Sequence, residues 1–249
     1  MNGILYFSAT GNSLFIAQKI KEKIGGQILY IPKYAGDGSE FEKIIVVSPI
    51  YSGGLPVHTY DLLPRLSKDV ELTVVLDYGG APMGADRLTL AYAQSLHLNL
   101  LAIYTVKMPE NYTLFFNPLK LFNDISVKKS FARAEKVADG ILHGEKHLPK
   151  KTKSKNDAYE KNKGNWHIIG ERFSVTDACV KCGKCVSVCP VNNISFADGK
   201  VTFSHQCVAC LGCYHRCPQK AIVYNGRRKK FRYVNPNVKE SDIGASEDL

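Results

Sequence analysis

Eight cysteines are the residues of this chain best suited to bind metal, and all of them lie in two short runs. Each run has the spacing C-x2-C-x2-C-x3-C and is followed directly by proline. The first run contains Cys179, Cys182, Cys185 and Cys189, and the second contains Cys207, Cys210, Cys213 and Cys217. The first three thiols of a run fit one tight loop and can converge on one metal centre, whereas the fourth lies farther along the chain. The two runs therefore predict two thiolate-bound metal centres.

This spacing resembles that of bacterial ferredoxins with two 4Fe-4S clusters, and the resemblance covers residues 173–224. It implies that the fourth cysteine of each run binds the cluster of the other run. The ligands implied for one cluster are Cys179, Cys182, Cys185 and Cys217, and those for the other are Cys207, Cys210, Cys213 and Cys189. Disulfides are rare in proteins that are not exported, and structural zinc pairs two C-x2-C motifs across a longer gap, so both alternatives are disfavoured.

A second group of polar residues follows the first apolar run of the chain. Its members are Ser8, Thr10, Gly11, Asn12 and Ser13, and a helical pattern comes directly after them. Hydroxyl groups and backbone N–H groups at a helix N-terminus suit a phosphate. The alternative is an ordinary helix start with Ser8 or Thr10 as its N-cap. Neither G-x-x-x-x-G-K-[ST] nor G-x-G-x-x-G occurs, which disfavours an NTPase and leaves dinucleotide binding unsupported.

Two later loops complete this candidate ligand site. The residues that we expect to contribute are Pro49, Tyr51, Ser52, Gly53 and Gly54 in one loop, and Tyr78, Gly79 and Gly80 in the other. In an open parallel sheet, ligands bind beyond the carboxyl ends of the strands, where all three loops would lie. Together the loops resemble those of flavodoxins, which implies bound FMN. Tyr51 or Tyr78 would stack on the flavin ring, because the only tryptophan, Trp166, lies far beyond these loops; ordinary packing is the alternative for both tyrosines.

Short apolar runs alternate with helical patterns as far as residue 144. The predicted strands are 4–7, 27–31, 43–49, 72–77 and 98–108, and the predicted helices are 13–23, 58–66, 87–96 and 127–142. Strands that alternate with helices indicate a parallel sheet covered on both faces. The predicted fold is therefore α/β, with a flavodoxin-like doubly wound five-stranded parallel sheet followed by a small α+β ferredoxin domain of the bacterial 2x4Fe-4S type.

Composition divides the chain further. The predicted divisions are a flavodoxin-like FMN-binding domain at 1–144, a basic linker at 145–168, a two-cluster 4Fe-4S ferredoxin domain at 169–226, and a basic and then acidic tail at 227–249. The linker is rich in lysine and poor in apolar residues, which is typical of a boundary between domains. We expect the polar end of the tail to fray and His215 to be solvated.

The formal net charge of +10 is concentrated in the linker and in residues 227–232. Such runs are either solvated or docking surfaces for an acidic partner, such as a low-potential ferredoxin-like electron donor or acceptor. No nucleic-acid-binding module accompanies the charge, so we expect no nucleic-acid partner. No apolar run is long enough to span a bilayer, and no secretion signal precedes the first apolar run, so we expect a cytoplasmic protein without a membrane span.

The order of these domains resembles that of fused flavodoxin–ferredoxin proteins called ferrodoxins. The resemblance implies an iron–sulfur flavoprotein that passes electrons between two 4Fe-4S clusters and FMN, and so converts one-electron to two-electron transfer. An oxidoreductase activity would follow, although no group of residues identifies catalytic side chains. Two alternatives stay open: a non-catalytic carrier that relays electrons to a partner enzyme, and a ferredoxin domain on a flavodoxin-like scaffold that does not bind FMN.

Overall fold

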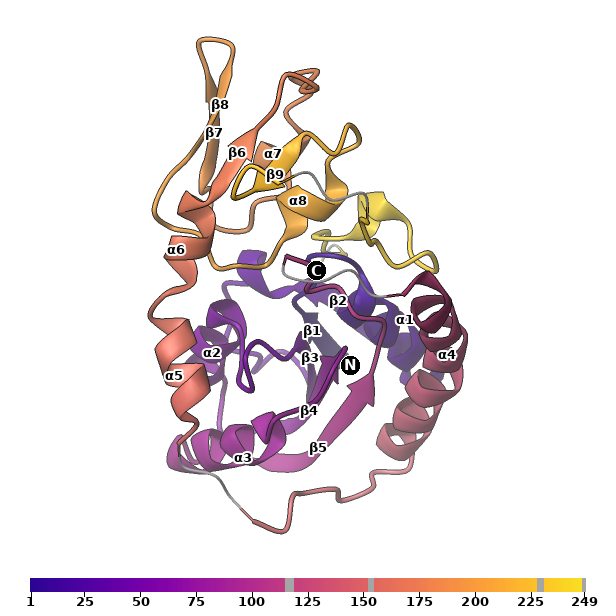
Figure 1. The fold of residues 1–249 in the computed structure, drawn as a ribbon. Coiled ribbons are helices and arrows are strands. Elements are labelled where there is room, and N and C mark those ends of the chain that lie inside the picture. Colours follow the sequence, from indigo (N-terminus) through magenta and orange to yellow (C-terminus); the bar gives the residue numbers. More distant parts are fainter. Residues whose placement is uncertain (115–118, 152–154, 228–230, 248–249) are drawn as a thin grey trace.

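The computed structural model describes residues 1–114, 119–151, 155–227 and 231–247. The chain forms two parts (Figure 1). The larger part contains a parallel sheet, and the smaller part, which contains both cysteine runs, lies over one end of that sheet. Among the described residues, no helix combines the length and the apolar character needed to cross a membrane.

Five parallel strands form the centre of the larger part. They are β1 (Asn2–Tyr6), β2 (Gln27–Tyr30), β3 (Lys43–Pro49), β4 (Glu71–Tyr78) and β5 (Leu100–Lys107). Their order is β2-β1-β3-β4-β5, which is the flavodoxin-like order with a switch point between β1 and β3. The middle of β3, from Ile44 to Val47, is buried on both faces, as its unbroken apolar sequence predicted. The predicted fold of this part is confirmed.

Helices cover both faces of the sheet. They are α1 (Asn12–Ile24), α2 (Val57–Leu62), α3 (Ala85–Ser95) and α4 (Lys120–Leu142), with short 3-10 turns η1 (Ile31–Lys33) and η2 (Leu63–Arg65). α1 and α4 pack together on one face, and α2 and α3 lie on the other (Figure 1). α4 begins seven residues before the predicted start, because Leu121, Phe122 and Ile125 are exposed and add nothing to the buried face on which the prediction depended.

The smaller part has the predicted α+β character. It contains β6 (Phe173–Val175), α7 (Lys184–Ser187), β7 (Ile194–Ala197), β8 (Lys200–Phe203), α8 (Gly212–Arg216) and β9 (Ile222–Tyr224). β6 pairs with β9, and β7 pairs with β8, both antiparallel. Phe173, Tyr214 and Tyr224 form a small aromatic core between the two cysteine runs. This core also contains Leu114 from the larger part, which joins the two parts.

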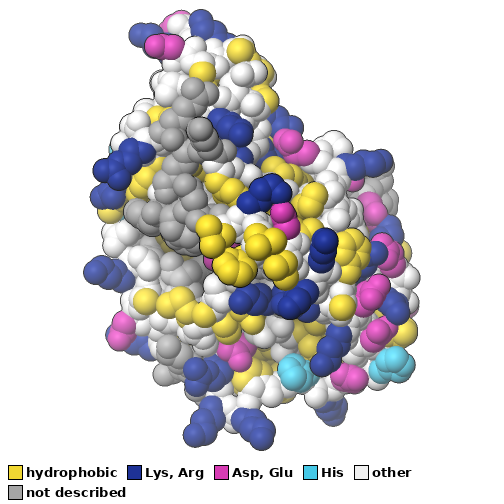
Figure 2. Space-filling view, turned by 45° about the vertical axis from the view of Figure 1, so that its right-hand side comes forward, with side chains coloured by type: hydrophobic (Ala, Val, Ile, Leu, Met, Phe, Trp, Pro, Cys, Tyr) yellow, Lys and Arg dark blue, Asp and Glu magenta, His cyan; other side chains and the backbone are white. Residues whose placement is uncertain are grey.

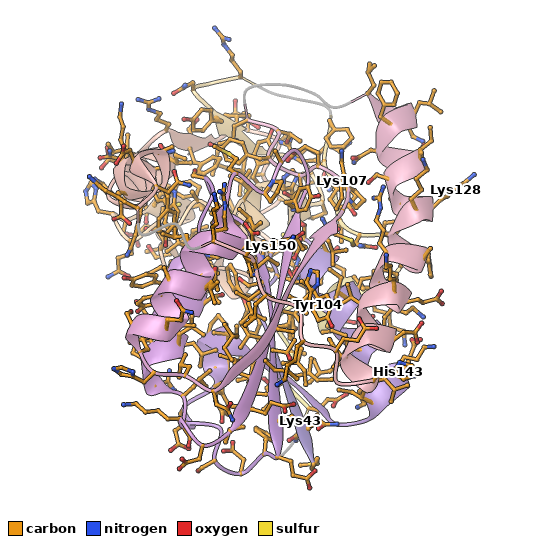
Figure 3. The ribbon with its side chains drawn as sticks, turned by 90° about the horizontal axis from the view of Figure 1, so that it is seen from below. Lys43, Tyr104, Lys107, Lys128, His143 and Lys150 are labelled. Carbon is orange, nitrogen blue, oxygen red and sulfur yellow. The ribbon has the colours of Figure 1, made fainter. Side chains whose placement is uncertain are left out.

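The segment predicted as a linker is packed against the larger part for much of its length. It contains α5 (Asp157–Lys163) and the start of α6 (Trp166–Glu171). Asn156 caps α5 by accepting a hydrogen bond from the backbone N–H of Tyr159, and both Tyr159 and Trp166 are buried. Farther back, the carbonyl of His147 accepts a hydrogen bond from the N–H of Ile103 at the free edge of β5. The His147 ring stacks on Tyr104, whose place on β5 is visible in Figure 3.

The expectation of a frayed tail is wrong for residues 235–247. Asn235 and Ile243 are buried, and a short turn, η3 (Glu240–Asp242), lies between them. The backbone N–H of Glu247 donates to the carbonyl of Ile28, so this segment runs along the free edge of β2. Both edges of the sheet are therefore covered, which removes exposed N–H and C=O groups that could pair with other chains. The prediction failed because the segment is polar and is held by specific hydrogen bonds rather than by an apolar face.

Candidate functional site

The cysteines gather into two sets, each lining its own hollow. One hollow is lined by Cys179, Cys182, Cys185 and Cys217, and the other by Cys189, Cys207, Cys210 and Cys213. These sets cross between the runs in the way that the ferredoxin resemblance implies. α7 and α8 lie side by side, and the fourth cysteine of each run follows one of these helices. The fold thus brings all eight thiols to two places.

Local backbone geometry explains how each cysteine loop forms. Lys181, Gly183, Ala209 and Leu211 all have left-handed backbone conformations, which wind the chain tightly between the thiols. The fourth cysteine of each run accepts a hydrogen bond from an N–H group four residues later. The N–H of Asn193 lies 3.2 Å from Cys189 Sγ, and that of Ala221 lies 3.3 Å from Cys217 Sγ. Such donors favour the thiolate form that binds metal.

Burial opposes that charge when the thiols carry no metal. It raises the pKa of Cys210 to about 12, so a free thiol there keeps its proton near neutral pH. Metal binding must therefore release this proton, which makes assembly of a centre pH-dependent. Among the described residues, no three side chains of His, Cys, Asp or Glu lie close enough together to hold a single metal ion. The four thiols of each set instead line a hollow.

The second set lies directly against the larger part. A Cβ atom on Gly212 would be 3.6 Å from the Cβ of Ala9, which lies in the loop after β1. Cys210 packs against the core of the larger part, and Ala209 packs with Tyr159 and Trp166. The second cysteine run therefore sits over the carboxyl ends of the strands, where a doubly wound fold binds its ligands.

Trp166 is the clearest residue that sequence reasoning placed too far away. Its ring meets the ring of Tyr51 edge-on, with centroids 5.9 Å apart and an interplanar angle of 90°. The tryptophan reaches this loop because α5 and α6 lead the chain back along the larger part. No periodicity or motif in the sequence marks that path. A predicted neighbour of the candidate flavin ring, Tyr51, is thus already in contact with an aromatic side chain.

The loop after β1, residues 8–13, is the first loop of the candidate ligand site. Its polar side chains all have protein partners. Ser8 Oγ accepts from the N–H of Gly11 at 2.9 Å, and Thr10 Oγ1 accepts from Asn111 Nδ2 at 2.7 Å. Ser13 donates from its hydroxyl to the carboxylate of Asp77 at the end of β4. These contacts leave Ser8, Thr10, Asn12 and Ser13 no more than 4% exposed. The phosphate of FMN does not fit the first loop in this closed arrangement.

The other two loops differ in how much of them is accessible. Pro49, Tyr51, Ser52, Tyr78 and Gly79 are half-buried, and Gly80 is exposed. Gly53 and Gly54 are buried against the linker instead: Cβ atoms there would lie 2.5 Å from Asn156 Nδ2 and 2.3 Å from the Tyr159 ring. The structure therefore brings the three predicted loops to one edge of the sheet, but it offers only part of them to a ligand. The half-buried residues fit the ring end of a flavin better than the first loop fits its phosphate.

His215 also differs from expectation, since it is buried at the contact between the two parts. Its Nδ1 accepts from the N–H of Tyr233 at 3.2 Å, which leaves Nε2 to donate to the carbonyl of Asn111 at 2.7 Å. Burial lowers the pKa of His215 to about 4, so the ring is neutral at physiological pH. The adjacent Arg216 is buried too and donates to the carbonyl of Glu240. These residues hold the second cysteine run to the loop after β5 and to the C-terminal segment.

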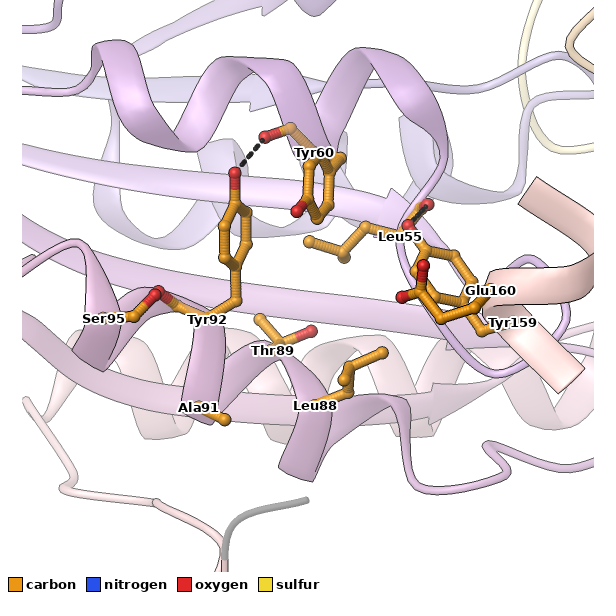
Figure 4. A pocket seen from close by; sticks show the side chains of 9 residues that line it. All are labelled: Leu55, Tyr60, Leu88, Thr89, Ala91, Tyr92, Ser95, Tyr159 and Glu160. Carbon is orange, nitrogen blue, oxygen red and sulfur yellow. Dashed lines mark hydrogen bonds between the residues drawn. The ribbon is translucent and has the colours of Figure 1, made fainter. Parts of the chain in front are cut away.

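A further hollow of about 270 Å³ lies outside the candidate site, between α2, α3 and α5 (Figure 4). Tyr60 and Tyr92 stack in its wall with ring centroids 4.2 Å apart, and the hydroxyl of Thr89 is buried there without a hydrogen-bond partner. None of the predicted site residues lines it.

On the outer surface, hydrophobic side chains gather among Lys and Arg on the face that includes α4 (Figure 2). The exposed apolar residues at the beginning of this helix are Leu119, Leu121 and Phe122.

Comparisons with known proteins match the two parts separately. Residues 178–222 match a family described as the 4Fe-4S dicluster domain. Among solved structures, the Flv1 flavodiiron core from Synechocystis sp. PCC6803 is similar, with 16% identity, a TM-score of 0.37 and coverage of 56% of this chain and 36% of that chain. A flavodoxin from Fusobacterium nucleatum bound to flavin mononucleotide is similar at 16% identity and a TM-score of 0.41, with 57% and 96% covered. A two-electron reduced flavodoxin from Megasphaera elsdenii is similar at 19% identity and a TM-score of 0.37, with 43% and 85% covered.

The present chain thus spans only about a third of the length of the flavodiiron core. The search of curated proteins found no match. The smaller part is an iron–sulfur domain by its family match, and the larger part is flavodoxin-like by its strand order. Together they define an iron–sulfur domain joined to a flavodoxin-like fold.

Asp77 gives the larger part a testable pH dependence. Burial raises the pKa of this carboxyl to about 7, and the hydrogen bond from Ser13 offsets only part of the shift. The folded state therefore binds a proton more tightly than the unfolded chain, so stability falls as pH rises from about 4 through about 7. We expect Asp77→Asn to remove this loss. Between about pH 5.5 and pH 8, its free energy of unfolding should rise relative to the unsubstituted protein by about 2 kcal/mol.

Urea unfolding followed by far-UV circular dichroism measures this difference. The exposed Asp69→Asn substitution is the matched control and should show no such trend. Parallel pH profiles for Asp77→Asn and the unsubstituted protein would show that Asp77 titrates normally.

Proposed function

We propose that this protein passes electrons between two 4Fe-4S clusters and an FMN at the strand ends of the larger part, and so converts one-electron to two-electron transfer. The observation that carries this proposal is the close approach of the second cysteine run to the first loop, where a Cβ atom on Gly212 would lie 3.6 Å from the Cβ of Ala9. A cluster bound by the second set and a flavin bound by the three loops would be neighbours. In a reaction of this kind the cofactors do the redox chemistry, and the protein holds and orients them.

The residues proposed as cluster ligands are the two cysteine sets that line the two hollows. The N–H donors of Asn193 and Ala221 stabilise negative charge on sulfur, and such hydrogen bonds are among the factors that set cluster potential. When FMN is bound, it supplies a store for one or two electrons. The half-buried residues proposed to contact its ring are Tyr51, Ser52, Tyr78 and Gly79, with Pro49 and Gly80 beside them. The first loop is proposed to bind its phosphate only after the contacts made by Thr10 and Ser13 change.

A second candidate function is favoured by those same contacts. If the first loop stays closed, the larger part is a scaffold, and the smaller part alone carries electrons to a partner enzyme. The burial of Thr10 and Ser13 favours this candidate. The close approach of Gly212 to Ala9 favours the flavin protein, because a scaffold needs no redox centre at its strand ends.

Cysteine variants test the crossing of the two sets. Cys182 and Cys189 belong to the same run but to different sets. We expect either single alanine variant to lower the iron content from about eight to about four atoms per chain. The double variant Cys182→Ala/Cys189→Ala should lose nearly all of its iron. Cys182→Ala/Cys185→Ala, which removes two residues of one set, should keep about four atoms. Equal iron in the two double variants would contradict the assignment.

The flavin is tested by anaerobic purification and absorbance. Flavin bands should persist in the protein after the clusters are bleached; their absence from protein supplied with FMN would leave the scaffold as the function. Thr10→Val/Ser13→Ala removes two hydroxyl groups from the first loop. We expect it to weaken FMN retention by about tenfold or more and to leave iron unchanged, because two hydrogen bonds to a charged group are lost. The control Thr105→Val/Ser95→Ala changes exposed residues and should alter neither quantity.

We also propose an acidic, ferredoxin-like protein as the electron donor or acceptor. The support is the exposed positive charge of the linker, where Lys146, Lys150, Lys151, Lys155 and Lys161 all face solvent. Of the second positive run, Arg232 is engaged inside the smaller part, where it lies over the Tyr214 ring, and residues 228–230 lie outside the described residues, as does Lys153. The docking proposal therefore depends on the linker.

Salt dependence tests this partner. Reduction by an acidic ferredoxin should slow by about tenfold or more between about 0.01 M and about 1 M salt, because screening removes electrostatic steering. Lys150→Glu should slow it at low salt, whereas Lys68→Glu, an exposed change in the loop before β4, should not. Reduction by dithionite serves as the reference for intact cofactors. A rate of reduction that changes with neither salt nor Lys150→Glu would rule out this docking surface.

A further inference from the structure

The C-terminal segment, residues 233–247, covers the first loop of the candidate ligand site. The backbone N–H of Asn235 donates to the carbonyl of Thr10 at 2.7 Å. Two side chains then reach the same atom of the loop: Tyr233 Oη and Asn235 Nδ2 donate to Asn12 Oδ1 at 2.7 and 3.0 Å. The segment thus supplies donors to the loop that the sequence predicted as a phosphate site.

Apolar contacts complete this cover. Gly11 has a φ of 95°, and a Cβ atom there would lie 2.6 Å from Val238 Cγ2 and 3.2 Å from Ile243 Cδ1. Ile243 belongs to the main core of the larger part. The segment therefore occupies the space above Gly11 and excludes solvent from it. A phosphate group that approached the loop from this side would meet Val238 and Ile243.

From Asp242 onward, the segment is anchored on β1 and β2. The hydroxyl of Tyr6 donates toward the carbonyls of Asp242 and Ala245, both at 3.0 Å, and accepts from the N–H of Gly244 at 2.9 Å. Glu247 pairs with Lys21 of α1 at 2.6 Å. These contacts do not involve the first loop, so they can persist when residues 233–238 move.

The smaller part holds the middle of the segment. Arg216 donates to the carbonyls of Glu240 and Ile243, and Lys184 forms an ion pair with Glu240 at 3.0 Å. Burial alone would raise the pKa of Glu240, but hydrogen bonds from Lys184 and Arg216 lower it below its usual range. Arg216 lies between Cys213 and Cys217, and Lys184 lies next to Cys185. The segment is therefore fixed to both cysteine runs as well as to the sheet.

We propose that the first loop is a binding site for the chain's own C-terminal segment, and that residues 233–238 must leave it before the phosphate of FMN can bind. The identity of the ligand rests on the proposed function. The competition itself rests on the contacts of Thr10, Gly11 and Asn12. A ligand that needs a minor open state binds with an apparent Kd increased by the inverse of the open fraction. Any change that loosens the segment must then tighten the binding of FMN.

Two asparagines allow a matched test in the full, cluster-containing chain. Asn235→Ala removes the donor to Asn12 and the side chain that accepts from the N–H of Asn237. Asn237→Ala removes an exposed side chain two residues away. FMN and riboflavin are each titrated into flavin-free protein, with quenching of flavin fluorescence as the readout. Riboflavin lacks the phosphate and so does not compete with the segment.

We expect Asn235→Ala to lower the apparent Kd for FMN by about tenfold, as loss of a buried hydrogen bond allows. The apparent Kd for riboflavin should not change, and Asn237→Ala should change neither. A second readout is the rate of trypsin cleavage after Lys239, which is exposed and directly follows the part of the segment that moves. FMN should speed this cleavage in the unsubstituted protein, whereas riboflavin should not.

The experiment distinguishes failure of the competition from failure of the flavin function. Equal FMN binding by the unsubstituted protein and Asn235→Ala, with an unchanged rate of cleavage after Lys239, would overturn the competition and leave the flavin function intact. Weaker FMN binding by Asn235→Ala would also overturn it, because the segment would then belong to the flavin site. Binding of neither FMN nor riboflavin by any of the three proteins would overturn the flavin function, and the competition with it.

Discussion

Parallel strands all end at the same edge of a sheet, and their loops there need partners. In this protein the partners are other parts of the chain. The second cysteine run covers the loop after β1 through Gly212, the linker covers the loop after β3 through Tyr159, and the C-terminal segment covers Gly11. The iron–sulfur domain, the linker and the tail thus each bury part of the same edge of the sheet.

Several titratable side chains at the contact between the two parts have protonation states or charges set by burial and pairing. His215 is neutral because burial lowers its pKa, and Asp77 binds a proton readily because burial raises its pKa. Arg216 and Lys184 both form ion pairs with the single carboxylate of Glu240. In a medium of low polarity, these ion pairs interact more strongly than they would in water.

The sequence predicted those features that depend on local patterns. Unbroken apolar runs such as 44–47 identified the strands, and cysteine spacing identified the iron–sulfur domain and grouped residues that the structure also groups. The packing of the linker was not predicted, and the expected fraying of the tail was wrong, because both positions depend on single side chains that bond to distant partners. Asn235 and Trp166 are examples. Nothing in the sequence around either residue distinguishes a packed polar segment from a solvated one.

For the same reason, the sequence predicted the loops of the candidate ligand site but not the C-terminal segment that covers the first of them. Ser8–Ser13 has the composition of a phosphate loop, and the structure puts it at a helix start as expected. Its closure depends on Asn111, Asp77 and residues 233–243, which follow the loop by many residues and show no motif.

The tail's anchoring on both parts has a consequence for the biosynthesis of the protein. Residues 233–247 are made after both parts of the chain, and they need Arg216 and β2 already in place before they can dock. While the ribosome is still adding this segment, the loop at Gly11 has no cover. A cofactor that binds during synthesis therefore reaches an open loop. The cofactor content of a molecule then depends on when binding occurs, and not only on the affinity of the finished protein.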